Sequence, residues 1–213
     1  MIVPFLESVG PRSTEEELLA AMEVLEPAIL KEVPWPDFPY CPLVRFRVAH
    51  TGTGIVLLYN VAEKHVRAHY RHINDPVYKD SCVEFFLSFD GVNYYNMEFN
   101  SLGVGLIGYG PAVKAARKRL PAEMVSQVRS FGRVRADPSE SGGKEWQLLL
   151  QIPVSVFEAE TIDTLAGLRC TANFYKCGDD LPEPHYVAWN PISYPVPNFH
   201  LPRYFGILQF SDD

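Results

Sequence analysis

The sequence lacks the features that mark membrane-spanning and nucleic-acid-binding proteins. No apolar run in its 213 residues approaches the roughly 20 residues that a membrane-spanning helix needs. Its 19 lysines and arginines are outnumbered by 26 aspartates and glutamates, and the net charge of −7 disfavours nucleic acid and anionic lipid as partners. The chain opens without a basic, apolar leader. We therefore expect a cytoplasmic location for the sequence as it stands, and a secreted or periplasmic one if a leader has been removed.

Cysteine is also scarce, and its spacing excludes two common uses. None of Cys41, Cys82, Cys170 and Cys177 belongs to a Cys-x-x-Cys pair, so zinc-ribbon and thioredoxin-like motifs are absent. Cys82 and Cys170 lie in apolar runs, where buried thiols are common. We expect four reduced structural thiols, with one bridged pair as the alternative.

Helical patterns are almost confined to the N-terminal part of the chain. Ser13 followed by Glu16 has the form of a capping box, and apolar residues then recur at helical spacing. Pro27 interrupts this pattern, which predicts that the helix ends near Glu26 or kinks there. Residues 1–40 are therefore predicted to form a helix and a proline-rich lead-in.

The remainder of the chain, residues 41–213, has the pattern of an all-β domain. Short runs with a period of two follow one another, and a polar stretch at 137–144 is expected to form a hairpin loop. Many short strands with little helix between them favour an antiparallel, immunoglobulin-like β-sandwich. The expected strands cover residues 44–48, 54–60, 66–70, 82–89, 94–100, 125–134, 146–152, 168–175 and 205–210.

Polar residues alternate with apolar ones in two consecutive strands that a short turn should join as a hairpin. Because the apolar positions face the core, Glu84 should project from the other face together with Asn96, Glu98 and Asn100. Carboxylate and amide groups without lysine or arginine are good partners for hydroxyl groups. The alternative is an ordinary solvated sheet face.

Proline is concentrated near the C-terminal end, where six of the 18 prolines fall within residues 182–202. Such a segment forms neither a helix nor a central strand, so we expect a long, stiff loop. It contains Trp189 and Asn190. A rigidly held tryptophan can stack on the C–H face of a sugar ring while a neighbouring amide bonds its hydroxyls. Alternatively, Trp189 closes the open end of the sandwich.

These motifs, in this order, resemble those of the family 9 carbohydrate-binding modules. Residues 80–86, Asp-Ser-Cys-Val-Glu-Phe-Phe, are similar to that family's Asp-Ser-x-Val-Glu strand, and residues 146–153 to its Trp-to-Ile-Pro strand. Residues 95–103, 173–180, 189–190 and 205–206 resemble further segments of the family, so that the match spans most of 44–210. The resemblance implies a DOMON-like β-sandwich that binds sugars, commonly at chain ends, between two aromatic side chains.

The resemblance also implies roles for individual residues. Trp189 falls at the position of one of the two aromatic residues, and Tyr78 stands close to the position of the other, where the family has tryptophan. Glu84 and Asn100 match positions that bond sugar hydroxyls. The predicted carbohydrate-binding residues are Trp189, Tyr78, Glu84, Asn100, Glu98 and Asn190.

Members of this family also bind structural calcium, for which the resemblance offers three carboxylates, Asp90, Asp179 and Asp180. We expect no other cofactor. The predicted function is non-catalytic recognition of a mono- or oligosaccharide, including a chain end, in polysaccharide catabolism.

Two other functions are compatible with the same residues. A glycoside hydrolase could use Glu84 and Glu98 as its two carboxylates, although nothing in the sequence marks either for a raised pKa. A protein-interaction module could use the same groove. We expect a binding protein rather than an enzyme, and no catalytic residue is assigned.

Overall fold

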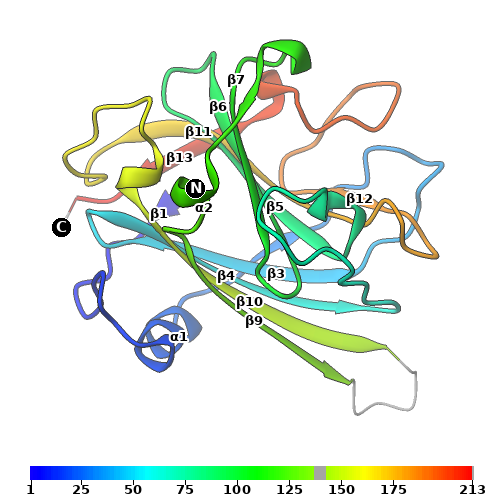
Figure 1. The fold of residues 1–213 in the computed structure, drawn as a ribbon, viewed down its shortest axis with the longest axis horizontal. Coiled ribbons are helices and arrows are strands. Elements are labelled where there is room, and N and C mark those ends of the chain that lie inside the picture. Colours follow the sequence, from blue (N-terminus) through cyan, green and yellow to red (C-terminus); the bar gives the residue numbers. More distant parts are fainter. Residues whose placement is uncertain (137–142, 213) are drawn as a thin grey trace.

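Two β-sheets packed face to face form the body of the protein in the computed structural model, which describes residues 1–136 and 143–212 (Figure 1). Within these residues the strands pair antiparallel, apart from the parallel pair β1–β13. The structure confirms the antiparallel β-sandwich that the sequence predicts.

The larger sheet, sheet A, has the strand order β1-β13-β11-β5-β6-β7-β8, and β12 also pairs with β11. Its strands are β1 (Ile2–Val3), β5 (Cys82–Ser88), β6 (Tyr94–Asn100), β7 (Gly105–Gly110), β8 (Lys118–Arg119), β11 (Arg169–Cys177), β12 (Tyr186–Ala188) and β13 (Gly206–Phe210).

The smaller sheet, sheet B, has the order β2-β3-β4-β10-β9. Its strands are β2 (Ala28–Leu30), β3 (Leu43–His50), β4 (Gly54–Glu63), β9 (Arg129–Ala136) and β10 (Lys144–Pro153). Short helices connect the strands: α2 (Ala122–Val125), η1 (Val77–Lys79), η2 (Lys114–Ala116), η3 (Val154–Val156) and η4 (Pro202–Tyr204).

The core between the sheets is built from the alternate apolar residues of the facing strands. Phe85 of β5 and Phe174 of β11 are stacked with ring centroids 4.8 Å apart, and Phe46 of β3 reaches Phe174 from sheet B at 4.2 Å. All three rings are buried. Odd-numbered positions of β5 therefore face the core, and even-numbered positions face outward from sheet A.

One end of this core encloses a charged cluster. The Lys176 ammonium lies 3.0 Å from a carboxylate oxygen of Glu63 and 2.7 Å from the Nε2 atom of His185. Trp146 donates its indole N–H to the other oxygen of Glu63 at 2.6 Å. Burial and the nearby lysine charge lower the pKa of His185 to about 3, so its ring is neutral near pH 7.

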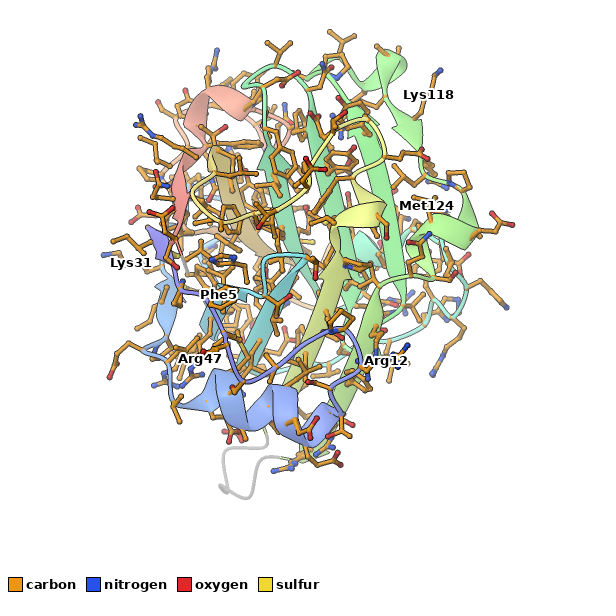
Figure 2. All side chains as sticks on the ribbon, turned by 90° about the vertical axis from the view of Figure 1, so that its left-hand side faces the viewer. Phe5, Arg12, Lys31, Arg47, Lys118 and Met124 are labelled. Carbon is orange, nitrogen blue, oxygen red and sulfur yellow. The ribbon has the colours of Figure 1, made fainter. Side chains whose placement is uncertain are left out.

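Helix α1 (Glu15–Glu23) covers part of the outer face of sheet B (Figures 1 and 2). Its N-cap is Thr14: the Thr14 hydroxyl accepts from the Glu17 amide at 3.2 Å, and the Glu17 carboxylate accepts from the Thr14 amide at 2.8 Å. The predicted pair Ser13 and Glu16 is thus wrong by one residue. The helix also ends before Pro27, as the proline requires.

Residues 1–40 are predicted as a helical lead-in, and in the structure they also complete both sheets. Strand β1 lies beside β13, β2 lies beside β3, and the Trp35 indole donates to the carbonyl of Tyr194 at 2.8 Å. Among the described residues, no helix is long and apolar enough to cross a membrane. All four cysteines are free, and Cys41 is the exposed one.

Two sequence predictions for strands need correction. Residues 66–70 are not a strand: the buried Asp80 carboxylate accepts from the amides of His69 and Tyr70, at 3.0 and 2.9 Å, and holds this segment as a loop. Residues 125–134 begin in α2 and enter β9 only at Arg129. The loop expected at 137–144 falls mostly outside the described residues.

Loops cover the outer face of sheet A and give it a second apolar cluster. Phe86 and Tyr175 project outward from β5 and β11, and Val77 and Phe199 pack on them from two separate loops. All four side chains are buried. A cavity remains between these loops and the sheet.

Candidate functional site

The cavity on the outer face of sheet A has two adjoining parts of about 290 and 220 Å³, which we call together the sheet A cavity. Both parts are lined by Tyr78, Glu98, Lys114 and His200. The larger part is also lined by Glu84, Cys177, Asp179, Tyr186, Pro197, Asn198 and Phe199. The smaller part adds Asn96, Leu106, Gly108, Arg117, Lys118 and Arg119. Each volume approaches the lower end of small-molecule sites, about 300 Å³.

Two glutamates form part of this cavity because β5 and β6 pair in register. Glu84 and Glu98 lie directly opposite each other, and their exposed fractions are 4% and 5%. The Asn96 amide donates to Oε1 of Glu98 at 2.8 Å, and the Cys177 thiol donates to Oε1 of Glu84 at 3.0 Å. Oε2 of Glu98 is buried without a hydrogen-bond partner. The outward polar patch that the sequence predicts is therefore a buried pair of carboxyl groups.

Burial determines the protonation of these carboxyl groups. It raises the pKa of Glu84 well above its ordinary value, and repulsion from Cys177 and Glu98 adds to this rise. Burial also raises the pKa of Glu98 to about 7, against the opposing effect of the Asn96 hydrogen bond. The pKa of Asp179 is raised by burial as well. Near pH 7 the cavity thus offers hydroxyl donors as well as carbonyl and carboxylate acceptors.

Aromatic side chains line the cavity from three different segments. Tyr78 comes from η1, Tyr186 from β12 and Phe199 from the proline-rich loop. Phe199 is stacked on Tyr175 with ring centroids 4.0 Å apart and an interplanar angle of 10°. The carbonyl of Tyr78 accepts from the amide of Asp179 at 3.2 Å, which attaches η1 to the end of β11. Both the sheet and the loops therefore hold these rings in place.

Arg117 orients the amide beside Glu98. Its guanidinium lies 3.9 Å from the ring centroid of Tyr94 and donates to the Tyr94 carbonyl at 2.9 Å. The same guanidinium donates to Oδ1 of Asn96. With its oxygen occupied by Arg117, the Asn96 amide presents its N–H group to Glu98.

His200 lines the cavity in a neutral form. Its Nδ1 atom is 2.8 Å from the Tyr94 hydroxyl. Burial and the charges of Arg117 and Lys114 lower the pKa of His200 to about 3. A neutral imidazole can donate or accept a hydrogen bond at its other nitrogen.

Asn100, predicted to bind a sugar, is engaged elsewhere in the structure. Its amide nitrogen donates to the Tyr70 carbonyl at 3.0 Å and to the Asp80 carboxylate at 3.1 Å. Its amide oxygen accepts from the amides of Leu102 and Val104. All the hydrogen-bonding atoms of this side chain therefore fasten two loops together, and Asn100 does not line the sheet A cavity.

Trp189 and Asn190 also lie apart from the sheet A cavity. The Trp189 backbone donates to the Phe174 carbonyl at 2.9 Å, and its ring packs edge-on against Phe174 and Phe46, at 5.6 and 6.4 Å. The backbone N–H of Asn190 donates to the side-chain oxygen Oδ1 of Asn173 at 2.9 Å. The structure therefore does not bring Trp189 and Tyr78 together as two sides of one sugar site; the Trp189 ring packs against the core instead.

The three aspartates expected to hold calcium do not form one site. Asp90 follows β5 and accepts from the amides of Val92 and Asn93 at 2.7 Å, as a turn residue does. Asp179 and Asp180 follow β11, whose end pairs with the beginning of β5, so the length of β5 separates them from Asp90. Asp180 lies near two cations, Arg67 and Lys79. The set does not fit a calcium ion.

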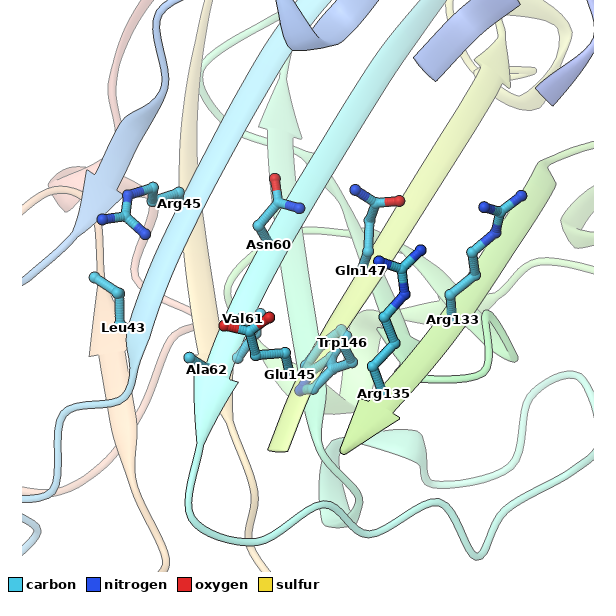
Figure 3. Close-up of a pocket in the computed structure, with 10 residues that line it drawn as sticks. All are labelled: Leu43, Arg45, Asn60, Val61, Ala62, Arg133, Arg135, Glu145, Trp146 and Gln147. Atoms are coloured by element: carbon cyan, nitrogen blue, oxygen red, sulfur yellow. The ribbon is translucent and has the colours of Figure 1, made fainter. Parts of the chain in front are cut away.

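A second cavity, of about 140 Å³, lies on the outer face of sheet B (Figure 3). We call it the sheet B groove. Four polar side chains cross it in register, one from each of four neighbouring strands: Arg45, Asn60, Gln147 and Arg133. The one aromatic residue in its lining, Trp146, is buried and bonded to Glu63, so the groove offers no exposed ring for stacking.

A β-sandwich with a cavity of carboxyl groups and aromatic rings is the architecture of a small-molecule-binding module. Residues 14–210 match the model of the family described as Carbohydrate-binding family 9. The chain belongs to this family. No curated protein matches the chain.

Solved structures agree with this assignment. A candidate carbohydrate-binding protein from Bacteroides uniformis ATCC 8492 is 38% identical, with a TM-score of 0.89 over 99% of this chain and 98% of its own. A family 9 module from Caldicellulosiruptor kristjanssonii in complex with glucose is 14% identical, with a TM-score of 0.55 over 100% and 96% of the two chains. A family 9 module from the same organism in complex with cellotriose is 13% identical, with a TM-score of 0.54 over 100% and 94% of the two chains. These two show the same fold.

Proposed function

We propose that the sheet A cavity binds a mono- or oligosaccharide without hydrolysing it, as a recognition step in polysaccharide breakdown. The observation that carries the proposal is the convergence of buried carboxyl groups and aromatic rings in one cavity of a carbohydrate-binding family member. The glucose and cellotriose complexes of modules with the same fold support glucose-containing saccharides as the first ligands to test.

The lining residues would divide the recognition of a sugar between them. Tyr78, Tyr186 and Phe199 offer apolar ring surface to the C–H faces of the sugar, each worth about 1–2 kcal/mol. Glu84 and Glu98 would bond its hydroxyls, and the unpartnered Oε2 of Glu98 is free to do so. Burial in the complex would strengthen these bonds because it excludes water.

The hydrolase alternative would use the same two glutamates. A glycosidase needs one carboxylic acid as proton donor and one ionised carboxylate as nucleophile or base. Here burial raises the pKa of Glu84 and Glu98 together, and Asp179, in the same cavity, is raised as well. Because these shifts are compatible with either function, the release of reducing sugar is the measurement that separates hydrolysis from binding.

Calorimetric titration tests the proposal, with glucose, cellotriose and a panel of other oligosaccharides as probes. We expect saturable binding to the wild type and a loss of tenfold or more, about 1.4 kcal/mol, in Tyr78→Ala and in Glu98→Gln. Gln147→Ala, in the sheet B groove, is the matched control and should bind like the wild type. No reducing sugar should be released.

Two outcomes would overturn the proposal. If no saccharide in the panel binds, the function is wrong. If Trp189→Phe or Gln147→Ala loses affinity while Tyr78→Ala and Glu98→Gln keep it, the location is wrong.

A further inference from the structure

Two buried thiols, one of which lines the sheet A cavity, have no part in the proposed sugar recognition. Cys82 on β5 and Cys177 on β11 are direct partners in the strand pairing, and their exposed fractions are 0% and 1%. Glu84 lies two residues beyond Cys82 and therefore on the same face of the strand. The two sulfur atoms and a carboxylate oxygen of Glu84 all lie within 4.8 Å of one another.

This cluster contains three acidic groups and no basic one. Lys176, adjacent to Cys177 in sequence, points through the sheet to the opposite face, where it pairs with Glu63. A divalent cation could replace the protons of the three acidic groups and supply the missing positive charge.

A buried carboxyl group lies beside this cluster. Oε2 of Glu98 is buried and has no hydrogen-bond partner, and Glu98 lies directly opposite Glu84 in the sheet. A buried polar atom without a partner is rare and calls for an explanation such as an absent ion or ligand. Cys177, Glu84 and Glu98 all line the cavity, which gives an ion a route from solvent.

The chemistry of the donors selects the kind of ion. Two thiols with carboxylate oxygens are the ligands of zinc and similar thiophilic ions, which favour four-coordinate sites. Calcium and magnesium prefer oxygen ligands alone. The cluster is therefore matched to a soft or borderline divalent cation.

We propose that Cys82, Cys177 and Glu84 form a binding site for a thiophilic divalent cation of the zinc class, with water as the fourth ligand. Binding releases up to three protons, one from each thiol and one from the Glu84 carboxyl, and changes the net charge of these three groups and the ion from +2 to −1. No electron is transferred. The proposal goes beyond saccharide recognition, because the ion needs no sugar in order to bind.

Cadmium titration of the reduced protein, in a thiol-free reductant and without saccharide, tests the proposal. Cadmium binds like zinc, and its thiolate bonds absorb in the ultraviolet. We expect this absorption to saturate at one ion per chain and to be reversed by zinc. Glu84→Gln should retain the absorption and weaken cadmium binding by tenfold or more.

Cysteine variants assign the signal to the pair. The double variant Cys41→Ser/Cys170→Ser keeps only Cys82 and Cys177 and should show the full absorption. Cys170 is a suitable control because it is a buried thiol on the same strand, β11, but packs in the core between the sheets. Cys82→Ser/Cys177→Ser should lose the absorption, with folding verified by circular dichroism.

The proposal is wrong if the wild type or Cys41→Ser/Cys170→Ser shows no saturable absorption, or if the folded Cys82→Ser/Cys177→Ser variant keeps it. Because no sugar is present, these results stand apart from the outcome of the saccharide titration.

Discussion

Replacement of Glu98 by glutamine should stabilise the protein at alkaline pH and leave its stability almost unchanged in acid. Glu98 is 5% exposed, and one of its carboxylate oxygens has no partner. When Glu98 ionises, the folded protein must hold a negative charge that water would solvate in the unfolded chain. Glutamine keeps an oxygen that can accept from Asn96 but never carries this charge.

The size of the effect follows from the shift in protonation. Burial raises the pKa of Glu98 from 4.5 to about 7, which corresponds to about 3 kcal/mol between the folded and unfolded states. Because the folded-state pKa is the higher one, the wild type has its full stability below pH 4.5 and loses it as the pH rises through 7. The advantage of the glutamine variant should therefore be small at pH 4 and about 3 kcal/mol at pH 8.

Urea unfolding at pH 4 and pH 8 measures this difference, provided that the slope of the transition is the same for both proteins. At pH 8 the advantage corresponds to about 6–12 °C in melting temperature for a chain of this size. Glu145→Gln removes the same charge from an exposed position in the sheet B groove and serves as the control. An equal effect of Glu98→Gln at both pH values would refute the reasoning.

Three further substitutions test the structure. Lys176→Met leaves the Glu63 carboxylate buried without its cation and should lower the free energy of unfolding in urea by about 3–5 kcal/mol. Adding Glu63→Gln should recover part of this loss. If the stability changes of the two single variants simply add up in the double variant, the pairing is contradicted. Thr14→Ala removes the helix cap and should cost about 1 kcal/mol in thermal unfolding, whereas Thr14→Ser should not. Asn100→Ala should lower the free energy of unfolding by about 1–3 kcal/mol, because it leaves the hydrogen-bonding partners of the Asn100 side chain unsatisfied. Unchanged stability together with weaker saccharide binding would instead place Asn100 in the binding site.

The sequence predicts the sandwich well where local alternation decides which side of a strand is buried. In β5 and β6 every second residue is apolar, so the pairing of the two strands as a hairpin and the outward position of Glu84 and Glu98 follow from the sequence. Residues 66–70, Val-Arg-Ala-His-Tyr, alternate as regularly but form no strand. Their backbone amides bond to the Asp80 carboxylate instead of to another strand, and such a long-range contact leaves no local pattern.

The candidate site is predictable only in part, for a related reason. Tyr78 and the glutamates lie on or beside strands whose positions the sequence indicates. Phe199 and His200 lie in a loop whose path depends on contacts with Tyr175 and Tyr94, which are distant in the chain. Trp189 lies in the same proline-rich region, but its backbone bond to Phe174 turns the ring toward the core. Composition marks this region as special without showing which rings face a ligand.

The parallel pair of β1 and β13 joins residues 2–3 to residues 209–210 and so connects opposite ends of the described chain. Strand β13 also pairs with β11, so this edge of sheet A forms only after residues 206–210 have been synthesised. During translation, β11 would present an unpaired edge to other chains, which is a condition for misassembly. Contacts over such sequence separations also slow folding. The timing of synthesis, and not only final stability, should therefore limit the yield of folded protein.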